Sequence, residues 1–221
     1  MVRGLFVTGT DTGVGKTVVS AALMHRFRGV APLRYWKPIQ TGTESDDDTA
    51  EVARIGECEP GEVFTEGVRL PPPVSPHLAA RASGIRIEIK SLAASIETDS
   101  GNQRWIVEGA GGLLVPVNDT AMMIDLISAL GLPVVVAART TLGTINHTLL
   151  TIDALRRRDI RIGGVVLVGD NDDENRAAIE RYGRVSVLGV MPRFAPLTPA
   201  ALAAWSLTEL DPEDELLELL Q

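Results

Sequence analysis

Short apolar runs alternate with longer segments of helical periodicity along most of this chain. The runs are residues 5–7, 105–107, 132–138, 162–168 and 185–190. They are apolar at consecutive positions, and glycine, proline or polar turns bound them, so we expect strands buried on both faces, as in a parallel sheet. Apolar residues three and four apart predict helices at residues 16–28, 120–130, 144–158 and 172–182. The alternation predicts a doubly wound α/β fold, a mainly parallel sheet with helices on both faces.

Two regions interrupt this alternation. Residues 60–76 contain Pro71-Pro72-Pro73 and Ser75-Pro76, and this density of proline excludes a helix or a central strand there. We interpret the region as a long functional loop. From Thr198 onward the chain is acidic with helical spacing, which predicts a short C-terminal helix.

The length and charge of the chain limit what it can be. Its 221 residues, 45% of them hydrophobic, suit one folded domain over residues 1–221. A formal net charge of −8 argues against a nucleic-acid partner, and the single cysteine, Cys58, excludes a disulfide framework. No run approaches the ~18 apolar residues of a membrane span, and the first residues lack a secretory signal pattern. We expect a cytoplasmic protein without a membrane partner.

The first apolar run leads into a glycine-rich segment, GTDTGVGKT at residues 9–17, and a helical pattern follows at once. Such a turn lets backbone N–H groups converge on phosphate oxygens at a helix N-terminus. We therefore predict a nucleotide site and a fold of the P-loop NTPase type, with Lys16 at the β- and γ-phosphates and the Thr17 hydroxyl on Mg²⁺. The residues predicted to bind the nucleotide here are Gly13, Val14, Gly15, Lys16, Thr17 and Val18. The alternative is a strand–turn–helix junction with chance glycines.

Lys37 is the second lysine that the sequence singles out. Only three of the 21 basic residues are lysines, and Lys37 follows a predicted strand at residues 31–36, within the segment KPIQTG. The carboxyl ends of parallel strands face the ligand crevice, so we expect Lys37 and the turn residue Thr41 to lie there. On position alone, an ordinary surface lysine is an equally good interpretation.

Two acidic segments can supply metal ligands. Asp46-Asp47-Asp48 opens a predicted helix, where acids usually act as caps, but one of them can also reach a metal on the phosphate loop. Glu108 ends the apolar run at residues 105–107 and precedes Gly109-Ala110-Gly111-Gly112. Carboxylates in this position face the nucleotide cleft, and the glycines let the backbone approach a ligand closely. We predict that Glu108 is functional.

These segments resemble the dethiobiotin synthetase family. The matching motifs are GTDTGVGKT, KPIQTG, DDDTAEVA, SPH, VEGAGG and LGTINH, and they lie within residues 4–150. A phosphate loop alone is widespread, whereas KPIQTG, SPH and VEGAGG in this order are much more specific. The resemblance implies an ATP-dependent cyclo-ligase of biotin biosynthesis. It would close a ureido ring on 7,8-diaminononanoate, using CO₂ or bicarbonate and Mg·ATP, to give dethiobiotin, ADP and phosphate.

The resemblance also implies roles for individual residues. Lys16 would hold the ATP phosphates, and Thr17, Asp48 and Glu108 would be the Mg²⁺ ligands, with Asp48 preferred over Asp47. The residues implied to bind the substrate are Thr12, Lys37, Thr41 and Gly111. Of these, Thr12 and Lys37 would contact the reacting nitrogens and the carbamate.

The segment LGTINH is implied to bind the substrate carboxylate across a subunit boundary. Gly143, Thr144 and Asn146 would form a helix N-terminus contributed by the neighbouring subunit, and such a terminus favours an anion. This role implies a homodimer with the substrate site at its interface. The alternative is a plain helix start capped by Thr144.

The nucleotide-base site departs from the family pattern. Many members read adenine with an Asn-Asp pair after a late strand, but the position expected for the asparagine, Val168 or Gly169, holds none here. Asn171 is the alternative and would serve after a small shift of the loop. The family's other base contacts come from a Gly-x-x-Pro turn, which Gly189 to Pro192 match. We expect Gly169 and Pro192 to border the base, whose identity the sequence leaves open.

The mechanism explains why these residue types are needed. An amine attacks CO₂ to give a carbamate, the γ-phosphoryl group of ATP activates it, and the second amine closes the ring. Such a transfer needs positioning and charge neutralisation more than covalent help, which the ammonium groups of Lys37 and Lys16 can supply. With Thr12, whose role the resemblance implies, these are the predicted catalytic residues.

Two other kinds of protein share this phosphate loop. A cobyrinic acid diamide synthase-like amidoligase usually carries a glutaminase domain, for which 221 residues leave no room. A partitioning-type nucleotide switch carries a lysine where Asp11 stands here.

Overall fold

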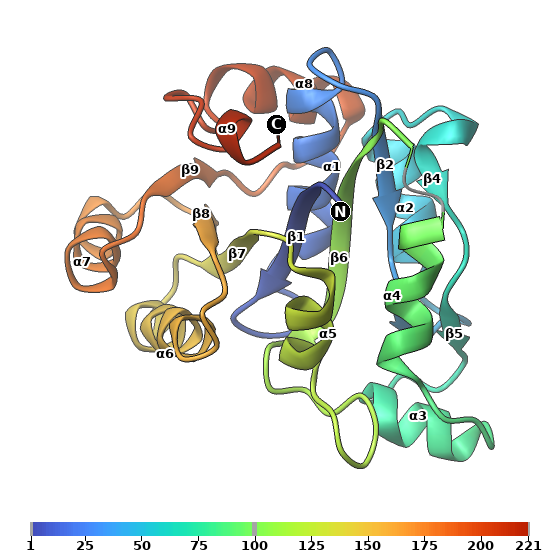
Figure 1. The fold of residues 1–221 in the computed structure, drawn as a ribbon. Helices are drawn as coiled ribbons and strands as arrows, with labels where there is room; N and C mark the ends of the chain where they lie inside the picture. The colour runs from blue at the N-terminus through green and yellow to red at the C-terminus, as the bar shows by residue number, and fades with distance from the viewer. Residues whose placement is uncertain (1, 99–100, 221) are drawn as a thin grey trace.

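A computed structural model describes residues 2–98 and 101–220 of the chain (Figure 1). Its main sheet has seven parallel strands in the order β4-β2-β6-β1-β7-β8-β9. These strands are β1 (Gly4–Gly9), β2 (Leu33–Trp36), β4 (Val63–Phe64), β6 (Arg104–Gly112), β7 (Val134–Arg139), β8 (Ile162–Val168) and β9 (Val187–Met191). The predicted parallel sheet is confirmed.

Helices cover both faces of this sheet and bury it in two apolar clusters. The helices on one face are α1 (Lys16–Phe27), α2 (Asp48–Ile55), α8 (Pro199–Thr208) and α9 (Leu217–Leu220). Those on the other are α3 (Pro76–Ala82), α4 (Ile89–Thr98), α5 (Met123–Leu130), α6 (Thr144–Arg156) and α7 (Asp173–Gly183). The prediction of a doubly wound α/β fold is therefore confirmed.

The continuous apolar character of β1 follows from this sandwiching. Leu5 and Val7 point into the cluster beneath α1, whereas Phe6 points into the cluster beneath α5, and all three are fully buried. Successive side chains of a strand face opposite sides, so a strand covered on both sides needs apolar residues at every position.

The proline-rich region contains more regular structure than the sequence predicts. Residues Pro60–Glu62 form a single 3₁₀ turn, and the edge strand β4 follows directly. A second, two-stranded parallel sheet pairs β3 (Ile39–Thr41) with β5 (Val68–Leu70). The exclusion of a helix was wrong at both ends of the region, because Pro60 begins the short 3₁₀ helix and Pro76 begins α3, and the first turn of a helix tolerates proline. The exclusion of a central strand is confirmed, since proline is compatible with short strands at an edge or outside the main sheet.

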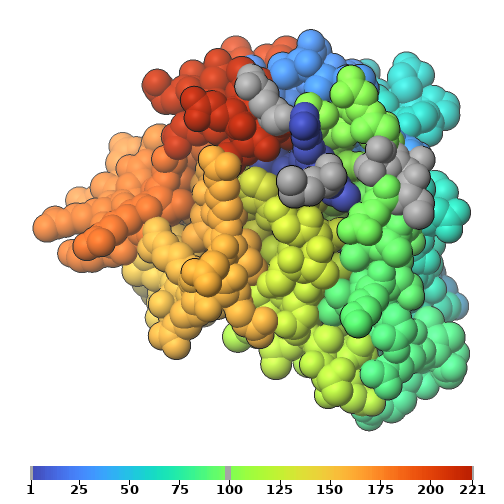
Figure 2. Space-filling view, in the orientation of Figure 1, coloured from blue at the N-terminus to red at the C-terminus, as the bar shows by residue number. Residues whose placement is uncertain are grey.

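The C-terminal segment forms two helices rather than one. A turn at Asp211 separates α8 from α9, and the Asp211 carboxylate accepts hydrogen bonds from the backbone of Glu215 (2.9 Å) and Leu216 (2.9 Å). Arg26 of α1 donates to the carbonyl oxygens of Leu210 (3.0 Å) and Asp211 (3.2 Å). These contacts fix the tail beside the N-terminal part of the molecule, where the red and blue surfaces meet in Figure 2.

The strand order brings three strand ends together. From β1 the chain crosses through α1 to β2, and β6 later inserts between β2 and β1, while β7 pairs on the other side of β1. Ligands of open parallel sheets bind at the carboxyl ends of strands where the order reverses.

Across the described ranges, no helix is both long enough and apolar enough to cross a membrane.

Candidate active site

The phosphate loop joins β1 to α1 and needs glycine for its shape. Gly13 and Gly15 have φ angles of 68° and 96°, in the left-handed region that glycine adopts most readily, and Gly15 is the N-cap of α1. A Cβ atom at Gly15 would lie 3.1 Å from a methyl group of Val168. The loop is tied to β7 by a hydrogen bond from the Thr10 amide to the Ala137 carbonyl (3.0 Å).

Lys16 folds back over this loop. Its ammonium group donates to the carbonyl oxygen of Asp11 at 3.0 Å, and the residue is largely buried. Burial, and then the charge of Lys37, lowers the pKa of Lys16, although Glu108 opposes that shift. Asp11 itself pairs with Arg139 at the end of β7.

Lys37 and Glu108 meet because their strands are neighbours. In the β2–β6 pairing, Trp36 lies opposite Val107, so the next residue of each strand reaches the same edge of the sheet. Lys37 Nζ lies 2.6 Å from Glu108 Oε1, and Glu108 is fully buried. Burial alone would lower the pKa of Lys37, but the carboxylates of Glu108 and Asp48 outweigh it and raise that pKa, so the group carries a positive charge.

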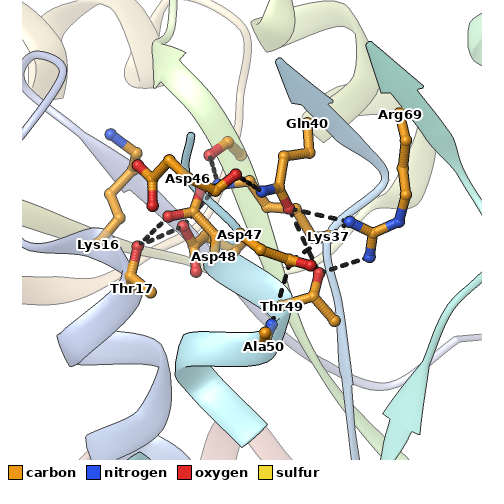
Figure 3. A network of polar contacts seen from close by, with 12 residues as sticks. Lys16, Thr17, Lys37, Gln40, Asp46, Asp47, Asp48, Thr49, Ala50 and Arg69 are labelled. Atoms are coloured by element: carbon orange, nitrogen blue, oxygen red, sulfur yellow. Dashed lines mark hydrogen bonds and ion pairs between the residues drawn. The ribbon is translucent and has the colours of Figure 1, made fainter. Parts of the chain in front are cut away.

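Asp48 approaches the same point from the start of α2 (Figure 3). Its Oδ2 lies 2.5 Å from Lys37 Nζ, and its Oδ1 accepts from the Thr17 hydroxyl at 2.8 Å. Burial opposes ionisation of this carboxyl, but Lys37 and then the Thr17 hydrogen bond outweigh it and lower the pKa of Asp48. Asp47 instead caps α2, accepting from the Ala50 amide at 3.1 Å.

Thr17, Asp48 and Glu108 together form a set of oxygen donors. The Thr17 hydroxyl also lies 3.2 Å from Glu108 Oε1, so all three side chains converge. Within residues 2–98 and 101–220, no group of three or more His, Cys, Asp or Glu side chains is placed to hold a metal. One hydroxyl and two carboxylates fit Mg²⁺, which takes one or two protein carboxylates and completes its octahedral shell with phosphate oxygens and water.

Tyr35, which the sequence patterns did not predict as a site residue, contacts Glu108 on the side away from Lys37. The Tyr35 hydroxyl donates to Glu108 Oε2 at 2.9 Å, and burial together with the nearby carboxylates keeps the pKa of Tyr35 well above its usual value. The sequence does contain a signal for this role of Tyr35. Side chains two residues apart lie on the same side of a strand, and Tyr35 is two residues before Lys37.

A second missed group holds the segment that carries Asp48. Arg69 of β5 donates to Thr49 Oγ1 (2.9 Å) and Gln40 Oε1 (3.3 Å), and Gln40 donates to the Asp46 carbonyl (2.9 Å) (Figure 3). Nothing in the sequence marks Arg69, because its partners depend on the small β3–β5 sheet. The network fixes the start of α2 and so the place of Asp48.

Lys16, Lys37 and the three oxygen donors line one cavity of 670 Å³ at the strand ends. The predicted site residues on its wall are Thr12, Gly13, Gly15, Lys16, Thr17, Val18, Lys37, Thr41, Asp48, Glu108 and Gly111. The proline-rich loop supplies a further wall through residues 73–76. A Cβ atom at Gly111 would lie 3.7 Å from the Thr12 hydroxyl, so these two wall residues are close together.

The remaining predicted residues lie outside this cavity wall. Val14 is buried in the core beneath α1. Gly169 lies just past the end of β8 and Pro192 just past the end of β9, which are adjacent strands. Gly143 is the N-cap of α6, and Thr144 starts the helix, with its hydroxyl donating to the Arg139 carbonyl rather than capping the helix. Asn146, in the same first turn, is exposed.

Comparison with known proteins gives the family. A family model described as an AAA domain matches residues 3–201. An ATP-dependent dethiobiotin synthetase BioD of Paramagnetospirillum magneticum is 48% identical, covering 91% of this chain and 93% of its own length. The protein of the same name from Bradyrhizobium diazoefficiens is 45% identical, covering 92% of this chain and 93% of its own length. That from Brucella melitensis is 43% identical and covers 90% of both chains. This chain belongs to the dethiobiotin synthetase family. The resemblance drawn from its motifs is confirmed.

Solved structures of more distant proteins share the fold of this dethiobiotin synthetase family member. A ParA family ATPase of Chlorobium tepidum superposes with a TM-score of 0.57 at 11% identity, covering 93% of this chain and 98% of its own. The cell division protein MinD of Aquifex aeolicus superposes with a TM-score of 0.56 at 13% identity, covering 93% of this chain and 87% of its own. The similarity confirms the predicted P-loop NTPase type of fold.

Proposed function

We propose that this chain catalyses the ATP-dependent closure of a ureido ring on 7,8-diaminononanoate, with CO₂, to give dethiobiotin, ADP and phosphate. The observation that carries the proposal is the convergence of Lys16, Lys37, Asp48 and Glu108 on one cavity, in a chain whose relatives bear this enzyme's name. As a cyclo-ligase it would form two C–N bonds at the expense of one phosphoanhydride bond.

The phosphate loop holds ATP in this proposal. Backbone amides of residues 13–18 and the Lys16 ammonium bind the phosphates, because both present positive charge at the N-terminus of α1. Thr17, Asp48 and Glu108 are the residues that would hold Mg²⁺. The ion, when bound, neutralises charge on the β- and γ-phosphates. ATP and Mg²⁺ are thus the cofactors that this site needs.

Lys37 binds the carbamate. One amine of the substrate forms a bond to the carbon of CO₂ and releases a proton, leaving an anion that the buried ammonium stabilises where water is excluded. A compact ammonium suits this task better than a planar guanidinium does. Thr12, Thr41 and Gly111 lie on the cavity wall near Lys37 and Lys16 and orient the diamine.

Phosphoryl transfer and ring closure follow. A carbamate oxygen attacks the γ-phosphorus, ADP leaves, and Lys16 with the loop amides neutralises the charge that develops. The second amine then attacks the carbonyl carbon, and phosphate departs with the oxygen that joined it to the carbamate. The residues supply positioning and positive charge, and no covalent enzyme intermediate is required.

The substrate carboxylate binds at α6 of a second copy of the chain. Gly143, Thr144 and Asn146 lie outside the cavity of their own chain, and Leu142 beside them is fully exposed, as befits a segment that a partner covers. The proposal is a homodimer with the substrate site at its interface, located in the cytoplasm. Gly169 and Pro192 border the nucleotide base at the ends of β8 and β9.

The test is product formation from the proposed substrates. Protein is incubated with 7,8-diaminononanoate, bicarbonate, Mg²⁺ and each nucleoside triphosphate in turn, and mass spectrometry follows the cyclic urea and the nucleoside diphosphate. We expect both products in equal amounts with ATP. Hydrolysis of every nucleotide without formation of the urea would overturn the proposed function.

A further inference from the structure

Tyr35 of β2 lies beneath the site and makes one polar contact that the proposed mechanism does not use. Its side chain is fully buried, and its hydroxyl donates to Glu108 Oε2 at 2.9 Å. A phenylalanine at this position would fill almost the same space and would remove only the hydrogen bond. The hydroxyl is therefore the part of the residue that requires an explanation.

The two oxygens of Glu108 have different partners. Oε1 faces the cavity, where Lys37 Nζ lies at 2.6 Å and Thr17 Oγ1 at 3.2 Å. Oε2 faces the interior and is held by Tyr35. Because Glu108 is fully buried, an unpaired Oε2 would be costly, and the carboxylate would turn to find another donor. The Tyr35 hydrogen bond thus sets which oxygen points into the cavity.

The strands make this arrangement rigid. Tyr35 lies opposite Ile106 in the parallel β2–β6 pairing, two residues before Glu108. Its ring belongs to the apolar cluster beneath α1, and its position is fixed by packing on the same side of β2 that carries Lys37 two residues later. A donor held in this way orients a neighbouring ligand better than a loop side chain does.

We propose that Tyr35 is a positioning residue of the metal site, whose hydroxyl fixes the Glu108 carboxylate so that Oε1 presents its lone pairs to the divalent cation. This inference rests on the proposed function, in which Glu108 is a Mg²⁺ ligand. Hydrogen-bond partners of metal ligands raise metal affinity by orienting those ligands, and their removal typically costs 10–100-fold.

The first test compares Tyr35→Phe with Tyr182→Phe, which changes the chain's other tyrosine. Tyr182 lies on α7 and is 67% exposed, so its hydroxyl is a matched control. The affinity of each folded protein for Mn²⁺ is measured by electron paramagnetic resonance in the presence of ADP. We expect affinity to fall by roughly 10–100-fold for Tyr35→Phe and to stay within twofold for Tyr182→Phe.

The outcome separates this inference from the proposed function. The Mn²⁺ affinity of Glu108→Gln is measured alongside. If Glu108→Gln binds Mn²⁺ more weakly and folded Tyr35→Phe binds it as the wild type does, only the role of Tyr35 is overturned. Unchanged binding in Glu108→Gln overturns both the metal site and the inference. A structural role alone would lower the melting temperature of Tyr35→Phe and leave its Mn²⁺ affinity unchanged.

A second measurement does not depend on the folding of Tyr35→Phe. Incorporating 3-fluorotyrosine into the Tyr182→Phe protein labels residue 35 alone, and its ¹⁹F resonance is followed as Mg²⁺ is added in the presence of ADP. We expect the resonance to shift with the same midpoint as Mg²⁺ binding. A resonance that stays in place while Mg²⁺ binds would exclude contact between Tyr35 and a metal ligand.

Discussion

Replacing Lys37 by methionine should destabilise the metal-free protein and make its stability depend on Mg²⁺. Methionine keeps most of the length of the side chain and removes the charge that lies between Asp48 and Glu108. Two carboxylates would then share a largely buried site without the ammonium group that contacts both of them. Mg²⁺ neutralises the same two carboxylates, so we expect it to raise the melting temperature of Lys37→Met more than that of the wild type.

The size of the expected loss of stability follows from how deeply the two ion pairs of Lys37 are buried. Removing one partner of a buried ion pair costs about 3–5 kcal/mol. The Glu108 side chain is 0% exposed and that of Asp48 is 25% exposed, so water partly screens the second carboxylate, and we take the lower end, about 3 kcal/mol. In a chain of this size each kcal/mol shifts the melting temperature by roughly 2–4 °C, which predicts a fall of about 6–12 °C.

The assay is thermal unfolding of Lys37→Met in EDTA and in excess Mg²⁺. Lys90→Met is the matched control, because Lys90 is exposed on α4. A fall of less than about 2 °C, or the same fall with and without Mg²⁺, would refute the reasoning from the ion pairs.

The contribution of the Lys37–Asp48 pair should also depend on pH in a defined way. The pKa of Lys37 is raised in the folded protein. Its contribution to the free energy of unfolding is therefore complete below the pKa of about 10.4 in the unfolded chain, and is lost as the pH rises through the folded pKa. The pKa of Asp48 is lowered in the folded protein. Its contribution to the free energy of unfolding is therefore present above the pKa of about 3.9 in the unfolded chain, and is lost as the pH falls through the folded pKa. Urea unfolding should therefore show the largest difference between wild type and Lys37→Met from about pH 4 to 10. A difference that grows outside this window would contradict the assignment.

Three further outcomes test other parts of the account. Lys16→Ala should reduce ATP turnover by roughly 10²–10³-fold, measured by ADP release; near-normal turnover would remove Lys16 from the phosphate site. Burial raises the pKa of the Cys58 thiol to about 11, so a disulfide reagent at pH 8 should label it roughly 100-fold more slowly than a free cysteine, and equal rates would show an exposed thiolate. Sedimentation should give the mass of two chains, and Leu142→Glu should yield single chains; a wild type that is already monomeric at micromolar concentration rules out the shared substrate site.

Local patterns predicted much of the fold and the site. The strand, glycine turn and helix of residues 4–27 follow from neighbouring residues alone, and Lys37 and Glu108 each follow a buried strand. Both residues therefore had to reach the same edge of a parallel sheet, and the pairing of β2 with β6 brings them to 2.6 Å.

Contacts between distant segments were not predictable in the same way. Tyr35 reads as an ordinary core residue until β6 is known to lie beside β2. Arg69 lies in a proline-rich region, and its role depends on the small sheet with β3. The helices α3 and α4 and the turn at Asp211 were not predicted. That residues 1–221 form one domain stays a prediction, which a single unfolding transition would support.

The central claim is that a carbamate oxygen receives the γ-phosphoryl group within the cavity of Lys16 and Lys37. Bicarbonate labelled with ¹⁸O tests it most directly when supplied with 7,8-diaminononanoate and Mg·ATP and sampled before the label exchanges with water. We expect one ¹⁸O atom in each phosphate released, because the bridging oxygen departs with phosphorus. Unlabelled phosphate accompanying the cyclic urea would contradict the account.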